Sequence, residues 1–310
     1  MNSDKKIGIT GGDWLIGKAL RQNLSSPVKF ITRHSANEKL KDSETCILGN
    51  FADEKNIKHF VKDLDILIHT AAVVGPRGEF EIDFVRNDLV GSIELAKLFF
   101  KENPHGHFVF LSTAGGLYNL NDTSAKVETS EIFPDNIYGA VKYLVESALE
   151  GLGNVSVLRP APVYGDSLKK NQKIGLIDKL LKTTLPEYTS VPVDIFDNLN
   201  SSRDYLHVND LVEAILVIST KKAHNNYEVY NVGTGLGTSI SSVISMIEKI
   251  TSKRVSVNII PVDKIATSLV INSNKIFQEY GWKPKKELID GIAEMYIDLQ
   301  KKEQVLNASY

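Results

Sequence analysis

Two short segments carry side chains that could move a proton to and from an alcohol oxygen. Tyr138 and Lys142 are four residues apart in the run YGAVK, so a helix would place them on one face. Ser112 and Thr113 follow the apolar run 107–111, about 25 residues earlier. A phenol ordinarily titrates near pH 10, and an ammonium beside it would favour the phenolate. These residue types indicate acid–base chemistry at a sugar or alcohol oxygen, which Thr113, or failing it Ser112, would align.

A glycine-rich turn near the N-terminus predicts a dinucleotide site. Residues 6–17 read KIGITGGDWLIG, an apolar run that enters glycines, and an amphipathic pattern continues over 18–24. A strand, a tight turn and a helix in this order direct backbone N–H groups and a helix N-terminus at a pyrophosphate. Since this turn is independent of the Tyr/Lys pair, the two patterns together indicate redox chemistry that uses a bound dinucleotide.

Short apolar strands alternate with helical patterns through the first half of the chain. Most of the strands are rich in Val and Ile without alternation, which is typical of a parallel sheet covered on both faces. We expect strands at 7–10, 28–32, 46–48, 65–70, 108–112 and 155–158, and helices at 15–24, 54–62, 80–101 and 135–150. This order predicts an α/β fold with a doubly wound parallel sheet of the Rossmann type, whose ligands bind at the carboxyl ends of the strands.

The pattern becomes less regular after Gly165. We expect helices at 174–183, 208–219, 240–250 and near 288–301, and strands at 191–196, 228–232 and 255–260. The interleaving predicts a smaller C-terminal substrate lobe woven into the first domain. Residues 1–165 plus about 205–232 would form the dinucleotide-binding domain, and 166–204 plus 233–310 the substrate-binding lobe.

The composition argues against several kinds of partner. The formal net charge is −2 and no basic run exceeds two residues, so we expect no nucleic-acid partner. The single Cys46 excludes an internal disulfide and fits a reducing compartment. The first strand starts too close to Met1 for a signal peptide, and no apolar run approaches the roughly 18 residues that span a bilayer. We therefore expect a soluble, cytoplasmic protein without a membrane partner, and no metal site.

These motifs, in this order, resemble those of the extended short-chain dehydrogenase/reductase family, the NAD(P)-dependent nucleotide-sugar epimerases and dehydratases. The resemblance covers nearly the whole chain. Its segments are 10–17 (TGGDWLIG), 65–72 (DILIHTAA), 108–119 (FVFLSTAGGLYN), 138–142 (YGAVK), 157–165 (VLRPAPVYG), 202–211 (SRDYLHVNDL), 230–235 (YNVGTG) and the ending 281–291 (GWKPKKELIDG).

The resemblance implies a nucleotide-sugar substrate and an NAD(P) cofactor. Tyr138 would transfer the proton, Lys142 would lower the pKa of Tyr138 and hold the ribose, and Thr113 would align the substrate oxygen. Substrate contacts are implied for Thr113, Tyr138, Tyr164 and Arg203. Cofactor contacts are implied for Gly11, Gly12, Asp13, Trp14, Leu15, Ile16, Gly17, Arg33, Asn50, Phe51, Ala71, Ala72, Val73, Asn87, Lys142 and Pro160. The family also implies a homodimer through the helices 80–101 and 135–150.

Some polar residues have structural alternatives to a role in the site. Arg203 resembles the family arginine that binds the diphosphate, since a guanidinium suits phosphate geometry. A surface ion pair with Asp204 or Asp210 is the alternative for it. His69 and His207 are expected to be packing residues.

The chain departs from the family pattern at informative positions. Trp14 stands in place of the middle glycine and follows the acidic Asp13, so either the loop takes another path or cofactor affinity is reduced. Arg33 follows the second strand, where an NAD-specific member would place an acid, and an arginine suits the 2′-phosphate of NADP instead. Thr113 is followed by Ala114 and a glycine, not by the Asp-Glu of dehydratases, so dehydration is disfavoured.

Three functions stay open at this point. An epimerase would oxidise and re-reduce the sugar at C4, and an NADPH-dependent 4-keto-sugar reductase would only reduce it. A non-catalytic NAD(P)-binding regulatory protein is the alternative of another class, which Trp14 motivates. The specific sugar and nucleotide base depend on 166–202 and 261–274, where the chain matches the family least.

Overall fold

A seven-stranded parallel sheet forms the centre of the structure, a computed structural model that describes residues 5–33, 40–73, 75, 81–165, 175–186, 191–196, 199–220, 226–260 and 267–307. The spatial order is β11-β6-β5-β4-β1-β2-β3, and all neighbouring pairs are parallel. The strands are β1 (Ile7–Thr10), β2 (Val28–Thr32), β3 (Glu44–Leu48), β4 (Ile66–His69), β5 (His107–Leu111), β6 (Asn154–Pro160) and β11 (Tyr227–Val232). The predicted Rossmann-type α/β fold is confirmed.

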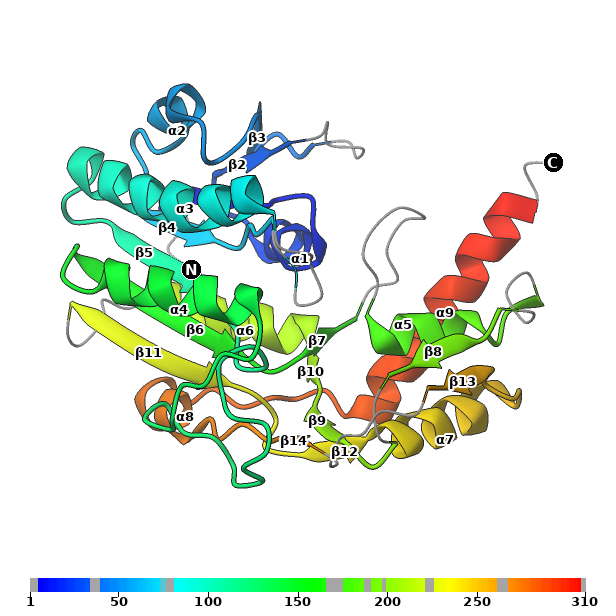
Figure 1. Ribbon diagram of the computed structural model, residues 1–310. Coiled ribbons are helices and arrows are strands. Elements are labelled where there is room, and N and C mark those ends of the chain that lie inside the picture. The colour runs from blue at the N-terminus through cyan, green and yellow to red at the C-terminus, as the bar shows by residue number, and fades with distance from the viewer. Residues whose placement is uncertain are drawn as a thin grey trace.

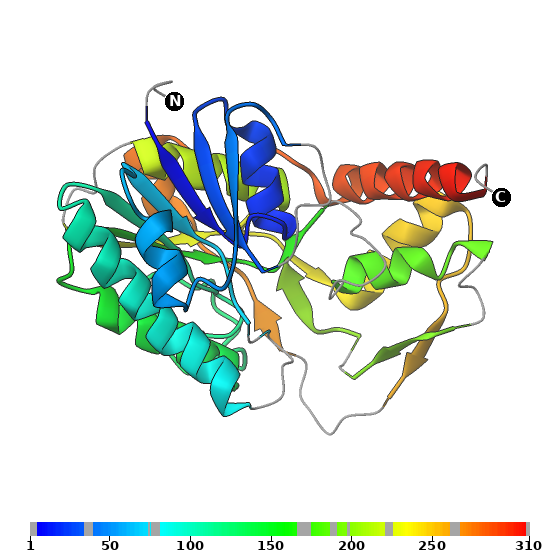
Figure 2. The same ribbon diagram turned by 90° about the horizontal axis from the view of Figure 1, so that it is seen from above.

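Helices cover both faces of this sheet (Figures 1 and 2). Within β4, Ile66 and Ile68 join the core on one face, and Leu67 joins the core on the other. The strands read as unbroken apolar runs because both faces are buried. The covering helices are α1 (Leu15–Asn23) and α6 (Val208–Thr220) on the first face, and α2 (Glu54–Phe60), α3 (Ile82–Glu102) and α4 (Ile137–Leu149) on the second.

The chain reverses its direction of travel through the sheet between β1 and β4. From β1 it proceeds outward to β2 and β3, and from β4 it proceeds the other way to β5, β6 and β11. The carboxyl ends of strands at such a switch point leave a crevice that binds ligands. Thr10 and His69, the last residues of β1 and β4, are register partners. The segments that follow these two residues therefore form the first place to look for a site.

A second group of helices lies beside the sheet (Figure 2). Residues from its helices and its parallel strand pair share a separate apolar core, which includes Leu180, Val243 and Ile292. These elements are α5 (Leu176–Lys182), α7 (Ile240–Thr251), α9 (Leu288–Asn307), β8 (Val193–Ile195) and β13 (Val257–Ile259).

Several short elements were not predicted from the sequence. β7 (Val163–Tyr164) pairs with β10 (Leu206–His207), and β9 (Ser202–Asp204) lies between β12 (Gly237–Ser239) and β14 (Ser268–Leu269). Strands of two or three residues are too short to show a period. α8 (Asn274–Tyr280) was also missed. Its Ile276, together with Trp282, belongs to the core of the sheet, although 233–310 was assigned to the substrate lobe. The division into two domains stays a prediction.

A buried carboxylate holds these short elements together. Asp204 is inaccessible to solvent and accepts hydrogen bonds from the backbone N–H groups of Thr234, Gly235 and Ile271, and from the Thr234 hydroxyl. Because burying a charge is costly unless hydrogen bonds satisfy it, these donors fix the segments after β11 and β14 relative to β9. Asp204 is thus a structural anchor and not the partner of Arg203.

Candidate active site

The glycine turn after β1 keeps the path that a dinucleotide site requires. Gly11 has φ +71°, a left-handed conformation that favours glycine. A Cβ on Gly17 would lie 2.3 Å from the Gly11 oxygen, and a Cβ on Gly12 would lie 2.4 Å from the Phe30 ring. By contrast Trp14, with φ −87° and ψ 168°, is in extended backbone open to any residue. The missing middle glycine therefore does not force the loop onto another path.

Asp13 is turned toward an internal cation. One carboxylate oxygen lies 3.4 Å from Arg21 Nη1, and the other accepts a hydrogen bond from the Thr32 hydroxyl at 3.3 Å. The buried Arg21 guanidinium also forms two bonds of 3.1 Å with Glu44. Since the Asp13 charge is paired within the protein, it opposes a pyrophosphate less than the sequence alone suggests.

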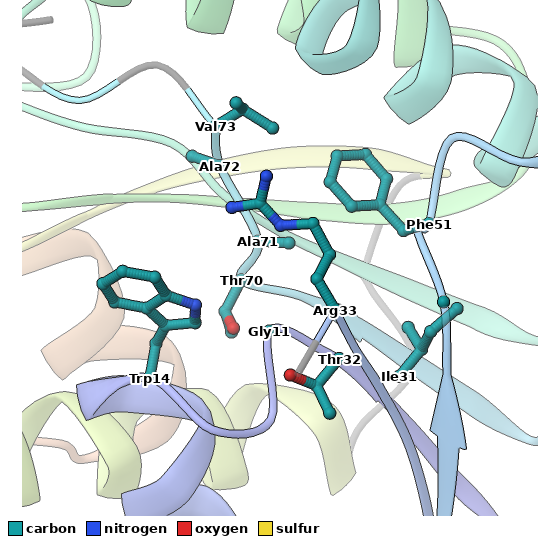
Figure 3. A pocket seen from close by; sticks show the side chains of 11 residues that line it. Gly11, Trp14, Ile31, Thr32, Arg33, Phe51, Thr70, Ala71, Ala72 and Val73 are labelled. Atoms are coloured by element: carbon teal, nitrogen blue, oxygen red, sulfur yellow. The ribbon is translucent and has the colours of Figure 1, made fainter. Parts of the chain in front are cut away.

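A pocket opens at the carboxyl ends of β1, β2, β3 and β4. Trp14 stands at its edge on the start of α1, Phe51 lies on the opposite side, and the Arg33 guanidinium extends across the space between them (Figure 3). The lining residues are Gly11, Trp14, Ile31, Thr32, Arg33, Gly49, Phe51, Thr70, Ala71, Ala72 and Val73. The pocket thus brings together seven of the residues expected to contact the cofactor.

The other expected cofactor residues lie around this pocket or apart from it. Gly12, Asp13 and 15–17 form the adjoining turn and first helical turn. Asn50 is not a lining residue, because its side chain accepts a hydrogen bond from the Ala52 N–H and closes a turn before α2. Asn87 is half-buried in α3, and Pro160 is buried at the end of β6. Sequence reasoning missed Gly49, Thr70, Ile31 and Thr32, of which the last two are the residues just before Arg33.

Beneath the pocket a buried histidine connects three elements. His69 Nδ1 lies 2.6 Å from the Thr10 hydroxyl oxygen, and Nε2 lies 2.8 Å from the Ser92 hydroxyl oxygen. Thr10 in turn accepts hydrogen bonds from the N–H of Ala71 and the hydroxyl of Thr70. Burial holds the pKa of His69 well below its usual value, so the ring is neutral. His69 is a structural residue, as expected, and it fixes the floor of the pocket.

A close approach of α4 to the turn after β5 brings Tyr138 to Thr113. The Asn136 side chain caps α4 by accepting from the Gly139 N–H at 2.9 Å. A Cβ on Gly139 would lie 1.7 Å from the Gly116 oxygen, so only glycine allows this contact. A Cβ on Gly116 would lie 3.2 Å from Thr113 Cγ2 and 3.3 Å from Tyr138 Cδ1, so the two side chains pack against the same point of this turn. The two predicted groups therefore meet.

Lys142 lies one helical turn further along, with its ammonium directed at the sheet. Nζ donates a hydrogen bond to the Leu111 carbonyl at 2.8 Å. The same nitrogen lies 4.7 Å from the centre of the Phe110 ring and 5.8 Å from the centre of the Tyr138 ring. Burial lowers the pKa of Lys142 to about 8, against the opposing charges of Asp88 and Glu146.

The expected lowering of the Tyr138 pKa is not found among the protein groups. Burial raises the pKa of Tyr138 to about 12, the Thr113 hydroxyl opposes the rise, and the charge of Asp88 adds to it. Burial is the largest of these effects, and the Lys142 ammonium donates to the Leu111 carbonyl. The protein groups by themselves keep Tyr138 protonated at neutral pH.

Ser112 does not share this arrangement. Its side chain is buried, and its hydroxyl has no hydrogen-bond partner among the described residues. Thr113, the preferred candidate, is the hydroxyl that meets Tyr138.

An ion pair behind the site was missed by sequence reasoning. Arg159 of β6 forms bonds of 2.6, 3.1 and 3.2 Å with Glu146 of α4 and donates to the Tyr118 hydroxyl at 3.0 Å. Both charged side chains are almost inaccessible to solvent. Because Glu146 is one turn beyond Lys142, this pair fixes the face of α4 that carries Lys142.

The remaining expected substrate residues lie elsewhere. Arg203 donates to the Thr267 carbonyl at 3.1 Å and to the Thr267 hydroxyl at 2.9 Å. The Tyr164 hydroxyl is buried against α9, where a Cβ on Gly291 would lie 2.3 Å from it, and its ring meets that of His207 edge to face. Their substrate roles stay predictions, and His207 packs as expected.

The family model of the NAD dependent epimerase/dehydratase family matches residues 7–233. The chain belongs to this family. It is 27% identical over 243 residues to the dTDP-4-dehydro-6-deoxyglucose reductase of Escherichia coli, covering 75% of this chain and 74% of that protein. It is 29% identical over 262 residues to the UDP-glucose 4-epimerase of Caenorhabditis elegans, and the match covers 76% of this chain and 73% of that protein. A solved UDP-glucose 4-epimerase of Thermotoga maritima, with UDP-glucose, superimposes with a TM-score of 0.86 at 24% identity, covering 96% of this chain and 99% of that one.

Membership of the epimerase/dehydratase family confirms the predicted class of enzyme, an NAD(P)-dependent epimerase or reductase of the extended short-chain dehydrogenase/reductase type. The pocket fits such a cofactor because its glycine turn leaves the first N–H groups of α1 without helical acceptors. In the described part of the chain, no helix is long and apolar enough to cross a membrane.

Proposed function

We propose that the protein oxidises and reduces the C4 position of a nucleotide-activated sugar. The juxtaposition of Tyr138 and Thr113, beside Lys142, carries this proposal. When bound, NAD(P) would accept or return the hydride of C4. The side chains would handle the proton: Tyr138 takes it from or gives it to O4, and Thr113 holds the same oxygen in line.

An epimerase is the first form of this proposal and follows the family. It removes the C4 hydride and the O4 proton, giving a 4-keto sugar, and then returns both with the hydride on the other face. The oxidation begins with Tyr138 as a base. Bringing its pKa from about 12 to neutrality requires about 7 kcal/mol of differential interaction. Lys142 and the positive charge of an oxidised nicotinamide would have to supply it.

A 4-keto-sugar reductase is the second form, and two observations favour it. The reduction begins with a protonated Tyr138, and the protein groups alone already keep Tyr138 protonated. Arg33 also lines the pocket, which contains no carboxylate among its lining residues, and its charge and fork geometry suit a 2′-phosphate. We therefore propose a preference for NADP over NAD.

One pair of assays separates these forms. In the first assay, UDP-glucose is incubated with the protein and a catalytic amount of NAD. In the second, dTDP-4-keto-6-deoxyglucose is incubated with the protein and a stoichiometric amount of NADPH. Formation of UDP-galactose without net consumption of the cofactor supports the epimerase. Oxidation of NADPH in the same molar amount as the reduced sugar that is formed supports the reductase. Tyr138→Phe should abolish either activity. Binding of NADPH or NADH without turnover on a panel of nucleotide sugars would favour the non-catalytic alternative.

The cofactor preference has its own test. Calorimetric titration should give at least tenfold tighter binding of NADPH than NADH, and Arg33→Gln should remove most of that difference while leaving NADH binding nearly unchanged. Equal affinities in the parent protein would refute the argument from Arg33.

We also propose a homodimer formed through α3 and α4, and a cytoplasmic location. Ile82 and Val90 of α3 and Leu144 of α4 are 67%, 49% and 52% exposed, and exposed apolar patches mark association sites. The two helices lie side by side on one face of the molecule (Figures 1 and 2). Light scattering at micromolar concentration should give twice the chain mass, and Leu144→Glu should halve it. A monomeric parent protein would refute the dimer.

A further inference from the structure

The buried Arg21 of α1 connects the glycine turn after β1 to two strands of the sheet. Its side chain and that of Glu44, at the start of β3, are almost inaccessible to solvent. Nε and Nη2 of Arg21 each form a bond of 3.1 Å with one of the two Glu44 oxygens, a fork that fixes the plane of the guanidinium. The centre of the Phe30 ring, on β2, lies 3.9 Å from its central carbon. Arg21 is therefore held in one orientation by the protein itself.

The remaining nitrogen of this guanidinium faces the glycine turn. Nη1 donates to the Gly12 carbonyl at 3.2 Å and lies 3.4 Å from one carboxylate oxygen of Asp13. The other Asp13 oxygen accepts a hydrogen bond from the Thr32 hydroxyl at 3.3 Å. Thr32 lines the cofactor pocket at the end of β2 (Figure 3). Asp13 is thus held from two sides, by a charge and by a hydroxyl.

The bond to the Gly12 carbonyl also affects the backbone donors of the turn. In a trans peptide the C=O and the following N–H point in opposite directions, so the contact with Arg21 sets the direction of the Asp13 N–H. Backbone N–H groups of such a turn are the groups that bind a pyrophosphate. One side chain therefore influences both the charge of the turn and the direction of one of its donors.

We propose that Arg21 is a positioning residue of the cofactor site, which makes an acidic residue in the glycine turn compatible with a pyrophosphate. The carboxylate of Asp13 would otherwise repel the two phosphates that the turn binds. Arg21 is not among the residues that line the pocket, so it acts through Gly12 and Asp13. The inference rests on the binding of NAD(P) at this turn and on no step of the proposed reaction.

The other charged groups next to Arg21 do not take its place. Glu44 has the same sign of charge as Asp13. The backbone N–H of Lys41 donates to Glu44 at 3.0 Å, but the Lys41 ammonium donates to carbonyl groups at the end of α1, those of Arg21, Gln22 and Leu24. Within the described part of the chain, Arg21 is the cation whose side chain contacts Asp13.

A double-mutant cycle tests the inference. Arg21→Met removes the charge and keeps a long apolar side chain beside Phe30, and Asp13→Asn removes the acid. Calorimetric titration with NADPH gives the affinity of the parent protein, the two single variants and the double variant. We expect Arg21→Met to weaken binding by about tenfold, Asp13→Asn to bind at least as tightly as the parent, and the double variant to recover most of the loss. Arg254→Met is the matched control, because it removes an arginine that is 94% exposed and paired with Glu248, and its affinity should equal that of the parent.

The double variant separates the effect of charge from a loss of packing. If Arg21 only supports the turn mechanically, Asp13→Asn cannot restore binding, and the double variant should bind as weakly as Arg21→Met. Recovery of less than about half of the loss, on a logarithmic scale of affinity, would overturn the proposal. Binding by Arg21→Met with the affinity of the parent protein would also overturn it.

A second cycle keeps the proposal testable if Arg21→Met folds poorly. That variant leaves the buried Glu44 carboxylate without its guanidinium, which is a destabilising change. The cycle is then repeated in the Glu44→Gln protein, where this carboxylate is absent. The same recovery is expected, because Asp13 loses the same cation. Effects of Arg21→Met and Asp13→Asn that are additive to within about twofold would overturn the proposal.

The titrations require no sugar substrate, and they are repeated with NADH, which carries the same pyrophosphate. Equal affinities of the parent protein for both cofactors, together with recovery in the double variant, would support the role of Arg21 and refute the argument from Arg33. Tighter binding of NADPH without recovery would do the reverse. Binding of neither cofactor to the parent protein would refute both.

Discussion

Replacing Gly139 with alanine should damage catalysis more than stability. The added Cβ would lie 1.7 Å from the Gly116 oxygen and 2.6 Å from the Gly116 carbonyl carbon, where backbone atoms cannot swing aside. α4 and the turn 114–116 would have to separate by more than 1 Å, at an overpacking cost of about 1–3 kcal/mol. Alanine recovers about 1 kcal/mol because it favours a helix over glycine. The net loss of unfolding free energy should thus be about 0–2 kcal/mol.

The same displacement acts directly on the active site, because Tyr138 precedes Gly139 in the chain. A misplacement of about 1 Å between reacting groups can cost about a hundredfold in rate. Urea unfolding and steady-state turnover, measured on one preparation below the unfolding range, separate the two effects. Gly115→Ala is the control for stability, since its Cβ would meet only a Leu269 side-chain atom at 3.5 Å. If Gly139→Ala keeps both the stability and the turnover of the parent protein, Gly139 does not set the position of Tyr138.

The buried contacts support three further predictions. Gly291→Ala should lower the free energy of unfolding by about 1–3 kcal/mol, because its Cβ would overlap the buried Tyr164 hydroxyl; an unchanged urea midpoint would show that α9 can shift freely. Glu146→Gln should lower it by about 3–5 kcal/mol, since Arg159 is left with an unpaired buried charge; calorimetric melting checks this, and a loss below 1 kcal/mol would contradict it. Because the pKa of Lys142 is about 8, its ammonium is present below that pH, so turnover should fall as pH rises through 8; a profile flat to pH 10 would exclude a role for the charge.

The sequence was most informative where a single constraint fixes the residue pattern. β4 and β5 are buried on both faces, so each had to be a continuous apolar run, and each was predicted within one or two residues. Tyr138 and Lys142 are on one face of α4 because helical spacing alone requires it. By contrast β9, β12 and β14 depend on pairing between segments far apart in the chain. No local pattern encodes that pairing.

The direction of a side chain was the other feature that the sequence could not supply. Asp13 and Asp88 are both acidic residues close to the cofactor pocket, yet Asp13 is paired with Arg21 and Asp88 accepts from the backbone N–H of Val73. Each contact depends on which group lies within a few ångströms after folding. The sequence could identify an acid at each position but not the group that this acid contacts. Asn87, the expected cofactor residue, was one position from the residue that contacts Val73.

Trp14 stands where the family pattern has a glycine. This difference changes the mouth of the pocket but not the path of the loop. The extended backbone of Trp14 needs no glycine, and the left-handed Gly11 and the tightly packed Gly17 are both retained. What the change adds is an indole, 39% exposed, at the edge of the pocket opposite Phe51 (Figure 3). We therefore expect its effect to fall on entry and release of the cofactor. An enzyme that keeps its cofactor through the reaction gains little from such a change, whereas a reductase must exchange its cofactor at every turnover. Trp14 is thus a third observation, after Arg33 and the protonated Tyr138, that favours the proposed reductase over the epimerase.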